Sequence, residues 1–427
     1  MIAAEVFLWG TRIGVVSQAD ISDIPRFNYD ERFVKSGIEV SPLMMPLSDR
    51  IYSFPELNIR SFYGLPGLLA DSLPDKFGNI LISRYLADQG RSVQEFSAVE
   101  RLCYTGSRGM GALEYVPAMG YSNDAKATVD LDALVRLASD ILTQRDSFHV
   151  KTDHHAMEQI LQIGTSAGGA RAKAVIAWNR QTGDIRSGQV ETGDGYEYWL
   201  IKFDGVANNK DKGDKADVSS YTRIEYAYYL MARAAGVIMN TCKLYEESGR
   251  YHFLTKRFDK DQTNRKLHMH SLGGMAHFDF NDPGTHSYEQ ASDVLYRLGM
   301  GQEEVEELYR RMVFNVLARN QDDHVKNISF LMDRSGVWQL APAYDVTYAY
   351  DPTNFWLARH QMSINGKVEN ISKSDLKESG RRMNLSNRKI EAMIYRAENA
   401  VSMWETFAEK AGVPEESMLE IQRNLMI

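Results

Sequence analysis

Hydrophobic and polar residues follow three different patterns along the chain. Up to about residue 119, short apolar stretches such as AEVFLW and RFNYDERFV alternate with glycines and prolines, which favours β-rich or mixed structure. From about residue 122, apolar residues recur at helical spacing in DLDALVRLASDIL, and Asp130 is the expected N-cap. Amphipathic helical patterns predominate beyond about residue 286. We therefore predict an α+β fold with three parts: a β-rich or mixed part at 1–121, a central lobe at 122–260, and a mostly helical part at 261–427.

The central part combines buried strands with one amphipathic helix. KAVIAW, YWLIKF and YHFLTKRF are apolar enough to be buried strands. Between the last two, RIEYAYYLMARAAG carries apolar residues at helical spacing, and Gly236 is the expected C-cap. In the carboxyl-terminal part, KIEAMIYRAENAVSMWETFAEKAG keeps a helical pattern over its whole length.

A polar loop in the carboxyl-terminal part carries the strongest candidate chemistry. A helical pattern ends before the run Asn320–Asn327, and two short strands then flank the turn Asp333–Gly336. The second strand leads directly to Asp345. Phosphoryl transfer suits this arrangement, because it needs a carboxylate to accept a hydroxyl proton and oxygen ligands to hold Mg²⁺.

The spacing within this loop selects a base and two metal ligands. In the protein-kinase catalytic loop the base precedes the metal-binding Asn by five positions. Asp322 stands five positions before Asn327 and Asp323 only four, so Asp322 is the predicted base and Asp323 a supporting residue. Asn327 and Asp345 are the predicted Mg²⁺ ligands. The alternative is a turn capped by Asp and Asn, with His324 and Lys326 in solvent.

Two further features would suit a nucleotide. Lys202 interrupts the apolar strand YWLIKF and could reach phosphates, and Glu225 on the following helix could pair with it. The alternative is a lysine in water at a strand end and a glutamate favoured at a helix start. Upstream, Gly164, Gly168 and Gly169 would let backbone amides approach an anion, although an ordinary flexible turn also uses such glycines.

Composition narrows the function classes. The net charge of −8 provides no global attraction to nucleic acid, and two cysteines are too few for a disulfide framework or a thiolate metal site. No signal peptide is indicated and no apolar run is long enough to span a bilayer, so a soluble, cytoplasmic protein is expected. Three histidines could ligate zinc, but their spacing fits no standard site: His268, His270 and His277.

Several segments, in this order, resemble the HipA family of serine/threonine kinases, the toxins of bacterial toxin–antitoxin pairs. They are GTSAGGARAKA, YWLIKF, KRFDK, ARNQDDHVKN, APAYD and HQMSINGK, and the amino-terminal RFNYDERFV, PLMMPL and LPDKFGNILISRYL also match. The resemblance covers nearly the whole chain. QDDHVKN together with APAYD is its specific part.

The resemblance implies a kinase-like fold with a mixed amino-terminal part and an all-helical carboxyl-terminal part, using ATP and Mg²⁺. It implies that Ser166 is autophosphorylated and that Lys202 binds the ATP phosphates. The remaining roles follow by position: Asp322 as base, Asn327 and Asp345 as Mg²⁺ ligands, Gly168 and Gly169 in the ATP loop, and His324 and Lys326 as residues that shape the catalytic loop. Lys256 stands where some members have glutamate. His360, Gln361 and Met362 are family-like without an evident chemical role.

The resemblance also implies partners. These are a protein substrate, with an aminoacyl-tRNA synthetase as the family's example, and a helix-turn-helix antitoxin through which DNA would be met indirectly; no membrane partner is expected. Two other classes of function remain open on the sequence. A metal-dependent hydrolase could use the same carboxylates but usually needs more of them, and a binding-only pseudokinase could keep the fold without the activity.

Overall fold

The computed structural model describes residues 1–119, 129–143, 171–189, 192–206 and 220–427. Contacts divide the chain into two compact units. The first consists of Met1–Ser41, Met45–Ser219 and Lys243–Met269, and the second of Pro42–Met44, Ser220–Cys242 and His270–Ile427. Helix α8 (Tyr221–Ala235) belongs to the second unit, although the strands before and after it in the sequence lie in the first.

The first unit begins with an antiparallel sheet in the order β4-β3-β2-β1-β5. Its strands are β1 (Ile2–Leu8), β2 (Thr11–Gln18), β3 (Arg26–Tyr29), β4 (Ile51–Tyr52) and β5 (Leu113–Val116). The turn between β1 and β2 needs Gly10, whose φ is +80°. Gly14 is required by close packing, because a Cβ there would lie 2.3 Å from the Asn28 carbonyl oxygen.

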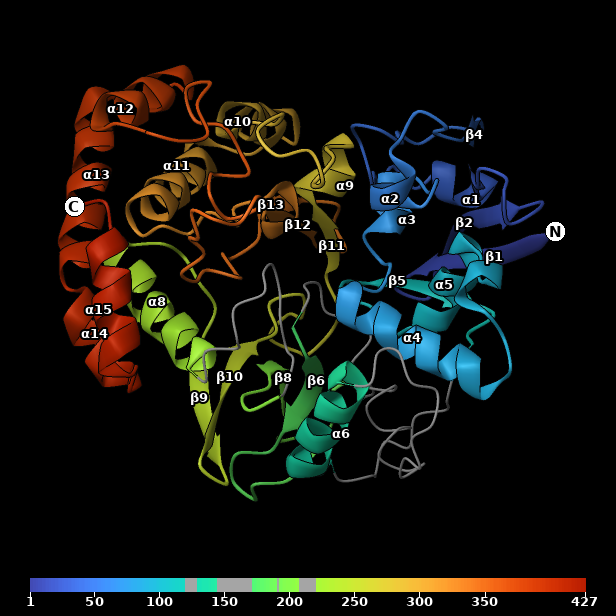
Figure 1. Cartoon of the computed structure of the whole chain (residues 1–427). Coiled ribbons are helices and arrows are strands. Elements are labelled where there is room, and N and C mark those ends of the chain that lie inside the picture. Colours follow the sequence, from blue (N-terminus) through green and yellow to red (C-terminus); the bar gives the residue numbers. More distant parts are fainter. Residues whose placement is uncertain (120–128, 144–170, 190–191, 207–219) are drawn as a thin grey trace. The chain divides into compact units, whose positions relative to one another are not determined.

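Several helices lie between β3 and β5 in the sequence. They are α1 (Glu31–Val34), α2 (Ile59–Phe62), α3 (Gly67–Ala70), α4 (Lys76–Asp88), the 3₁₀ turn Val93–Glu95 and α5 (Ala98–Thr105). Helix α5 contacts β1, β2 and β5 (Figure 1). Ser97 caps α5 and Glu100 reaches back to the Ser97 amide, which satisfies two backbone donors at the helix start.

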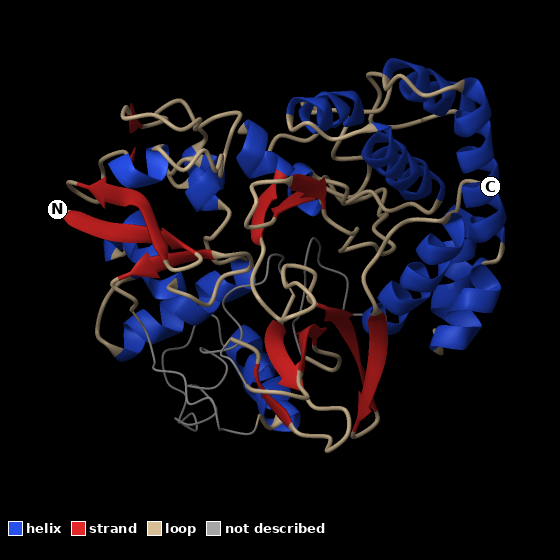
Figure 2. Cartoon of the chain, turned by 180° about the vertical axis from the view of Figure 1, so that it is seen from behind, coloured by secondary structure: helices blue, strands red, loops and turns tan. Residues whose placement is uncertain are grey.

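A second antiparallel sheet in this unit has the order β7-β6-β8-β10-β9. Its strands are β6 (Lys173–Trp178), β7 (Ile185–Ser187), β8 (Glu197–Lys202), β9 (Cys242–Glu247) and β10 (Arg250–Lys256), and helix α6 (Leu131–Thr143) lies beside it (Figure 2). The predicted Asp130 cap is confirmed, because its carboxylate accepts from the Ala133 amide at 3.0 Å. Leu134, Trp199 and Leu254 share one core between helix and sheet.

The second unit is a helical core with a small sheet. Its helices are α8, α9 (Leu272–Ala276), α10 (Tyr288–Arg297), α11 (Gln302–Leu317), α12 (Lys373–Arg382), α13 (Asn387–Ser402), α14 (Trp404–Ala411) and α15 (Glu415–Asn424). The sheet has the order β11-β12-β13, from β11 (His268–Ser271), of which His270 and Ser271 belong to this unit, β12 (Ser329–Met332) and β13 (Trp338–Leu340). Helices α13 and α14 pack along α8 (Figure 1).

Local predictions for this unit are largely confirmed. Helix α8 buries its predicted apolar stripe and ends at Gly236 in the left-handed conformation, with φ +91°. The predicted hairpin pairs Met332 with Trp338. The long carboxyl-terminal pattern breaks at Met403, because Trp404 turns into the core and donates its indole N–H to the Met418 carbonyl at 3.0 Å.

No helix in the described part of the chain is long and apolar enough to cross a membrane.

Candidate active site

Hydrogen bonds within the polar loop after α11 connect the predicted base to the predicted metal ligand. Asn327 lies at the end of a 3₁₀ turn (Val325–Asn327), and its side-chain Nδ2 donates to the backbone carbonyl of Asp322 at 2.8 Å. The Asn327 amide donates to the His324 carbonyl, also at 2.8 Å. The five-residue spacing found in the sequence therefore closes a small ring between the predicted base and the predicted metal ligand.

Side chains in this loop alternate between solvent and interior. The side chain of Asp323 is 1% exposed, whereas those of Asp322 and His324 are 21% and 18% exposed. Asp323 thus points inward between two outward-facing neighbours. This arrangement keeps Asp322 accessible, as a base that meets a substrate must be.

Three donors bind the Asp323 carboxylate. The Tyr288 hydroxyl donates at 2.9 Å, Nδ1 of His360 at 2.8 Å and the backbone N–H of Gln361 at 2.8 Å. Burial, followed by the nearby Asp323 charge, raises the pKa of Tyr288 well above its usual value, so the hydroxyl keeps its proton. The sequence predicted Asp323 as a supporting residue. That role stays a prediction, and these three contacts agree with it.

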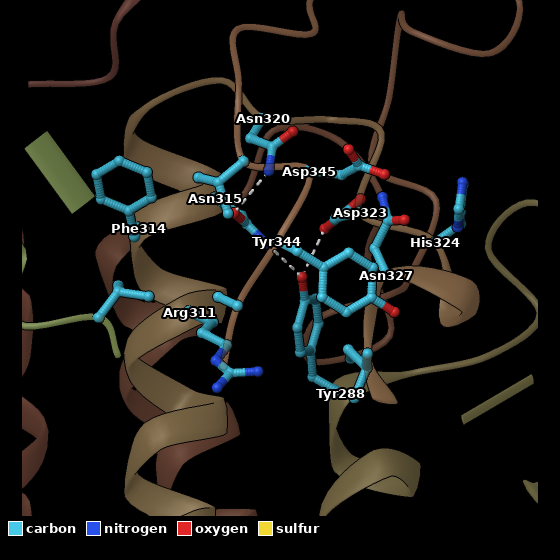
Figure 3. A pocket seen from close by; sticks show the side chains of 14 residues that line it. Tyr288, Arg311, Phe314, Asn315, Asn320, Asp323, His324, Asn327, Tyr344 and Asp345 are labelled. Atoms are coloured by element: carbon cyan, nitrogen blue, oxygen red, sulfur yellow. Dashed lines mark hydrogen bonds between the residues drawn. The ribbon is translucent and has the colours of Figure 1, made fainter. Parts of the chain in front are cut away.

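A chain of side chains extends from Tyr288 along the wall of a pocket (Figure 3). Nδ2 of Asn315 donates to the Tyr288 hydroxyl, and Nδ2 of Asn320 donates to Oδ1 of Asn315, both at 2.9 Å. Neither Tyr288 nor Asn315 stood out in the sequence, because each lies within an ordinary amphipathic helix.

The same pocket is lined by both predicted metal ligands, Asn327 and Asp345, together with His324 and Tyr344 (Figure 3). Asp345 has φ +51°, which is uncommon for a residue with a side chain and clusters at functional sites. The Tyr344 hydroxyl lies 2.5 Å from both the Lys326 carbonyl and the Ser329 hydroxyl. These contacts fasten the segment that carries Asp345 to the polar loop.

The residues present fit a hard cation. Asn327 uses Nδ2 in its bond to Asp322, which leaves Oδ1 as the atom that can ligate. A carboxylate and an amide oxygen are ligands that Mg²⁺ accepts, usually with waters and substrate phosphates completing the shell. Asp322 itself contributes its backbone to this region and is not among the residues that line the pocket.

A buried ion pair on α11 contacts the segment that leads to Asp345. Glu307 and Arg311 on α11 form an ion pair at 2.9 Å, and Arg311 also donates to the Ala341 carbonyl at 2.7 Å. Glu307 also pairs with Arg310 and accepts from the Ile238 amide at 2.9 Å. This pair therefore holds the chain just before Ala343–Asp345.

In the first unit, Lys202 lies at the end of β8 and is buried. The register places Lys173 of β6 directly opposite it, and both lie on the same face of the sheet. The Lys173 ammonium pairs with the Asp75 carboxylate at 3.3 Å. Two lysines opposite each other repel unless anions compensate them. Lys173 was not among the predicted site residues, although it stands in a strand just after the glycine-containing stretch.

Other predicted site residues are scattered. Glu225 is buried on α8 in the second unit, and its pairing with Lys202 stays a prediction. Ser166, Gly168 and Gly169 lie outside the described residues, as does Gly164. Lys256 forms an ion pair with Glu197 at 2.8 Å.

The histidines weighed for zinc have separate settings. Nε2 of His268 lies 3.0 Å from the Val40 carbonyl in the first unit, and His277 ends helix α9 in the second. Among the described residues, no group of histidine, cysteine and acidic side chains could hold a metal ion on its own.

Two family models match the chain in succession. The HipA N-terminal domain matches residues 4–116, and the HipA-like C-terminal domain matches residues 165–418, which is more than half of the chain. The chain belongs to the HipA family.

Two known proteins are similar to this HipA-family chain. A Haemophilus influenzae protein named "Putative kinase" is 30% identical over 101 residues, a match that covers 22% of this chain and 29% of that relative. The chain thus matches under a third of the length of this curated relative. The second is the toxin–antitoxin protein HipA of Shewanella oneidensis, whose structure was solved with HipB and its operator DNA. The structural match covers 99% of this chain and 94% of the Shewanella chain, with a TM-score of 0.69 at 16% sequence identity. This likeness confirms the HipA-type α+β fold.

Proposed function

We propose that this HipA-family chain is an ATP- and Mg²⁺-dependent serine/threonine protein kinase. One observation carries the proposal: the Asn327 side chain is fixed on the carbonyl of Asp322, five positions earlier, in a loop that shares a pocket with Asp345. This is the spacing of the protein-kinase catalytic loop, together with oxygen ligands of the kind that hold Mg²⁺ in phosphoryl transfer. The "Putative kinase" name of the relative agrees with it.

Each residue has a distinct task in this mechanism. Asp322, on the accessible side of the loop, accepts the proton of the substrate hydroxyl as that oxygen attacks the terminal phosphate. Asn327 and Asp345 would hold Mg²⁺, which neutralises charge developing on the phosphates. Lys202 provides a buried ammonium for the nucleotide phosphates. His324 and Lys326 shape the loop, and the Lys326 ammonium lies 4.5 Å from the centre of the Phe280 ring.

The decisive experiment measures transfer of labelled terminal phosphate from ATP to protein, with and without Mg²⁺. Asp322→Ala should lower transfer about a thousandfold without unfolding the protein, because the side chain is partly exposed and removes no core volume. Glu378→Ala, on an exposed helix face, is the control and should keep wild-type transfer.

The same assay separates the competing functions. A metal-dependent hydrolase would release free phosphate without labelling protein, and a pseudokinase would bind ATP and do neither. Wild-type rates in a folded Asp322→Ala variant would refute the base assignment.

We also propose that Ser166 is autophosphorylated and that the modification inhibits the enzyme. Phosphorylation adds close to two negative charges, which would oppose the phosphates of ATP. The support is the HipA-family membership and the glycines around Ser166 in the sequence. Intact-mass analysis after incubation with Mg²⁺ and ATP should show one added phosphate, which Ser166→Ala should abolish.

The proposed partners and setting follow from the family. We propose that a translation-related protein such as an aminoacyl-tRNA synthetase is the substrate, in the cytoplasm, and that a helix-turn-helix antitoxin binds this chain and brings it to DNA. The complex of Shewanella HipA with HipB and operator DNA supports the antitoxin. Phosphoproteomics of cells that express wild type or Asp322→Ala would identify the substrate.

A further inference from the structure

Asp323 is a deeply buried side chain of the polar loop, 1% exposed, and three donors bind it. Its Oδ2 accepts from Tyr288 at 2.9 Å and from His360 at 2.8 Å, and its Oδ1 accepts from the Gln361 amide at 2.8 Å. The donors come from α10 and from the segment that follows Asp345 along the chain. Asp323 therefore ties the loop to two other elements of the same unit.

We propose that Asp323 is the positioning residue of this site, acting through the loop and not on the substrate. The proposal rests on the proposed kinase function and adds the group that would set the geometry of the base and the metal ligand. None of its three hydrogen bonds involves Asp322 or Asn327, so the proposed effect passes through the backbone.

The route through the backbone is short. Asp323 shares a peptide bond with Asp322, and the carbonyl of Asp322 is the acceptor for the Asn327 side chain. With Asp323 fixed inward, the neighbouring Asp322 side chain faces outward and its carbonyl stays in place for Asn327. A shift of the Asp323 carboxylate therefore moves the base and the Asn327 ligand together.

The network beyond Asp323 limits such shifts. The Tyr288 hydroxyl is held in turn by Asn315, and Asn315 by Asn320 at the start of the same loop (Figure 3). The loop is thus fastened at Asn320 and at Asp323 through one connected set of hydrogen bonds. Directional bonds of this kind fix an orientation, whereas apolar packing alone would leave the loop free to slide.

The test compares two tyrosines that lose the same atom. Tyr288→Phe removes the donor to Asp323, and the control Tyr309→Phe removes an equally buried hydroxyl that donates to the Leu376 carbonyl at 3.0 Å. Asp323→Asn is the direct variant. The measurements are kcat for phosphate transfer, KM for ATP and the Mg²⁺ concentration that half-saturates nucleotide binding, with circular dichroism to verify folding.

Asp323→Asn should lower kcat about a hundredfold and raise the half-saturating Mg²⁺ concentration about tenfold, while KM for ATP stays near wild type. Tyr288→Phe should shift both quantities in the same direction and less strongly, and Tyr309→Phe should shift neither. If Asp323→Asn does not fold, Tyr288→Phe decides.

Two outcomes overturn the proposal: folded Asp323→Asn and Tyr288→Phe variants with wild-type kcat and Mg²⁺ response, or a Tyr309→Phe control that changes both as much as Tyr288→Phe does. A wild-type protein that binds Mg²⁺ and ATP but transfers no phosphate would refute the proposed kinase function alone. In that case the Mg²⁺ dependence of nucleotide binding in the same variants still decides the role of Asp323.

Discussion

The two units bury carboxylates in different ways. In the first, Asp259 receives two hydrogen bonds from the Arg257 guanidinium, at 2.9 and 2.6 Å, and one from the Gly111 amide at 2.7 Å. In the second, Asp323 is bound by a hydroxyl, an imidazole and a backbone amide. The first arrangement supplies a full opposite charge, and the second supplies three directional donors from two elements.

The difference shows what each carboxylate does. Asp259 lies just after β10 and accepts from the amide of Gly111, which precedes β5, so this hydrogen bond links the two sheets of the first unit. Burial by itself raises the pKa of Asp259, but the charge and hydrogen bonds of Arg257, with the Gly111 amide, outweigh it and lower the pKa. Asp323 instead orients one loop. A structural anchor needs strength, whereas a candidate catalytic loop needs a defined direction.

Loss of the Asp259 carboxylate should have the largest effect on stability. Asp259→Ala leaves the buried Arg257 without its carboxylate, and the free energy of unfolding should fall by about 3–5 kcal/mol. Chemical denaturation followed by tryptophan fluorescence measures it. Removing an exposed carboxylate in Glu378→Ala should cost under about 1 kcal/mol, and equal losses in the two variants would contradict the anchor role.

The pH dependence of stability extends the comparison to a buried histidine of the first unit, His252. Burial, followed by the charge of Arg250, lowers the pKa of His252 to about 4, and its Nδ1 accepts from the Asp204 amide at 2.9 Å. The unfolded chain then binds more protons than the folded one below about pH 6.5, so stability should fall as the pH drops from about 6.5 to 4, by about 3 kcal/mol in total.

The matched variant for this titration is His252→Asn, which keeps an acceptor for the Asp204 amide and cannot titrate. Its unfolding free energy should change less over the same pH range. An identical pH profile in the variant and the wild type would show that other groups cause the acid sensitivity.

The smallest of the predicted effects concerns the Lys173–Asp75 pair. Lys173→Met removes the ammonium 3.3 Å from Asp75, and the free energy of unfolding should fall by about 2 kcal/mol, less than for Asp259 because the contact is longer. Asp75→Asn keeps an oxygen that can cap α4 through the Gly78 amide.

A double-mutant cycle tests the pair itself. The combined variant should lose less stability than the sum of the two single variants, because the second change no longer breaks an ion pair. Additive losses would mean that the Lys173 and Asp75 charges do not interact. Of the two ion pairs, only Arg257–Asp259 would then stabilise the first unit.

Much of the local structure could be predicted from the sequence, because its causes lie within one or two turns of chain. The apolar stripe of α8, the glycine that ends it, the Asp130 cap and the hairpin at Asp333–Gly336 all follow from spacing and turn chemistry. The ring between Asp322 and Asn327 is also local, since it spans five residues. Met403 shows the limit: the helical pattern continues through it, and the packing of Trp404 breaks the helix.

What the sequence by itself determined is part of the set of elements, the polar loop and the residue types suited to phosphoryl transfer. Only the tertiary structure decided which of two adjacent aspartates faces inward, because the partners of Asp323 are 35 and 37 residues away in Tyr288 and His360. It likewise brought Lys173 opposite Lys202 and against Asp75. Periodicity shows which face of an element is buried. The donors that satisfy a buried charge, however, come from residues distant in the sequence, so only the tertiary structure identifies them.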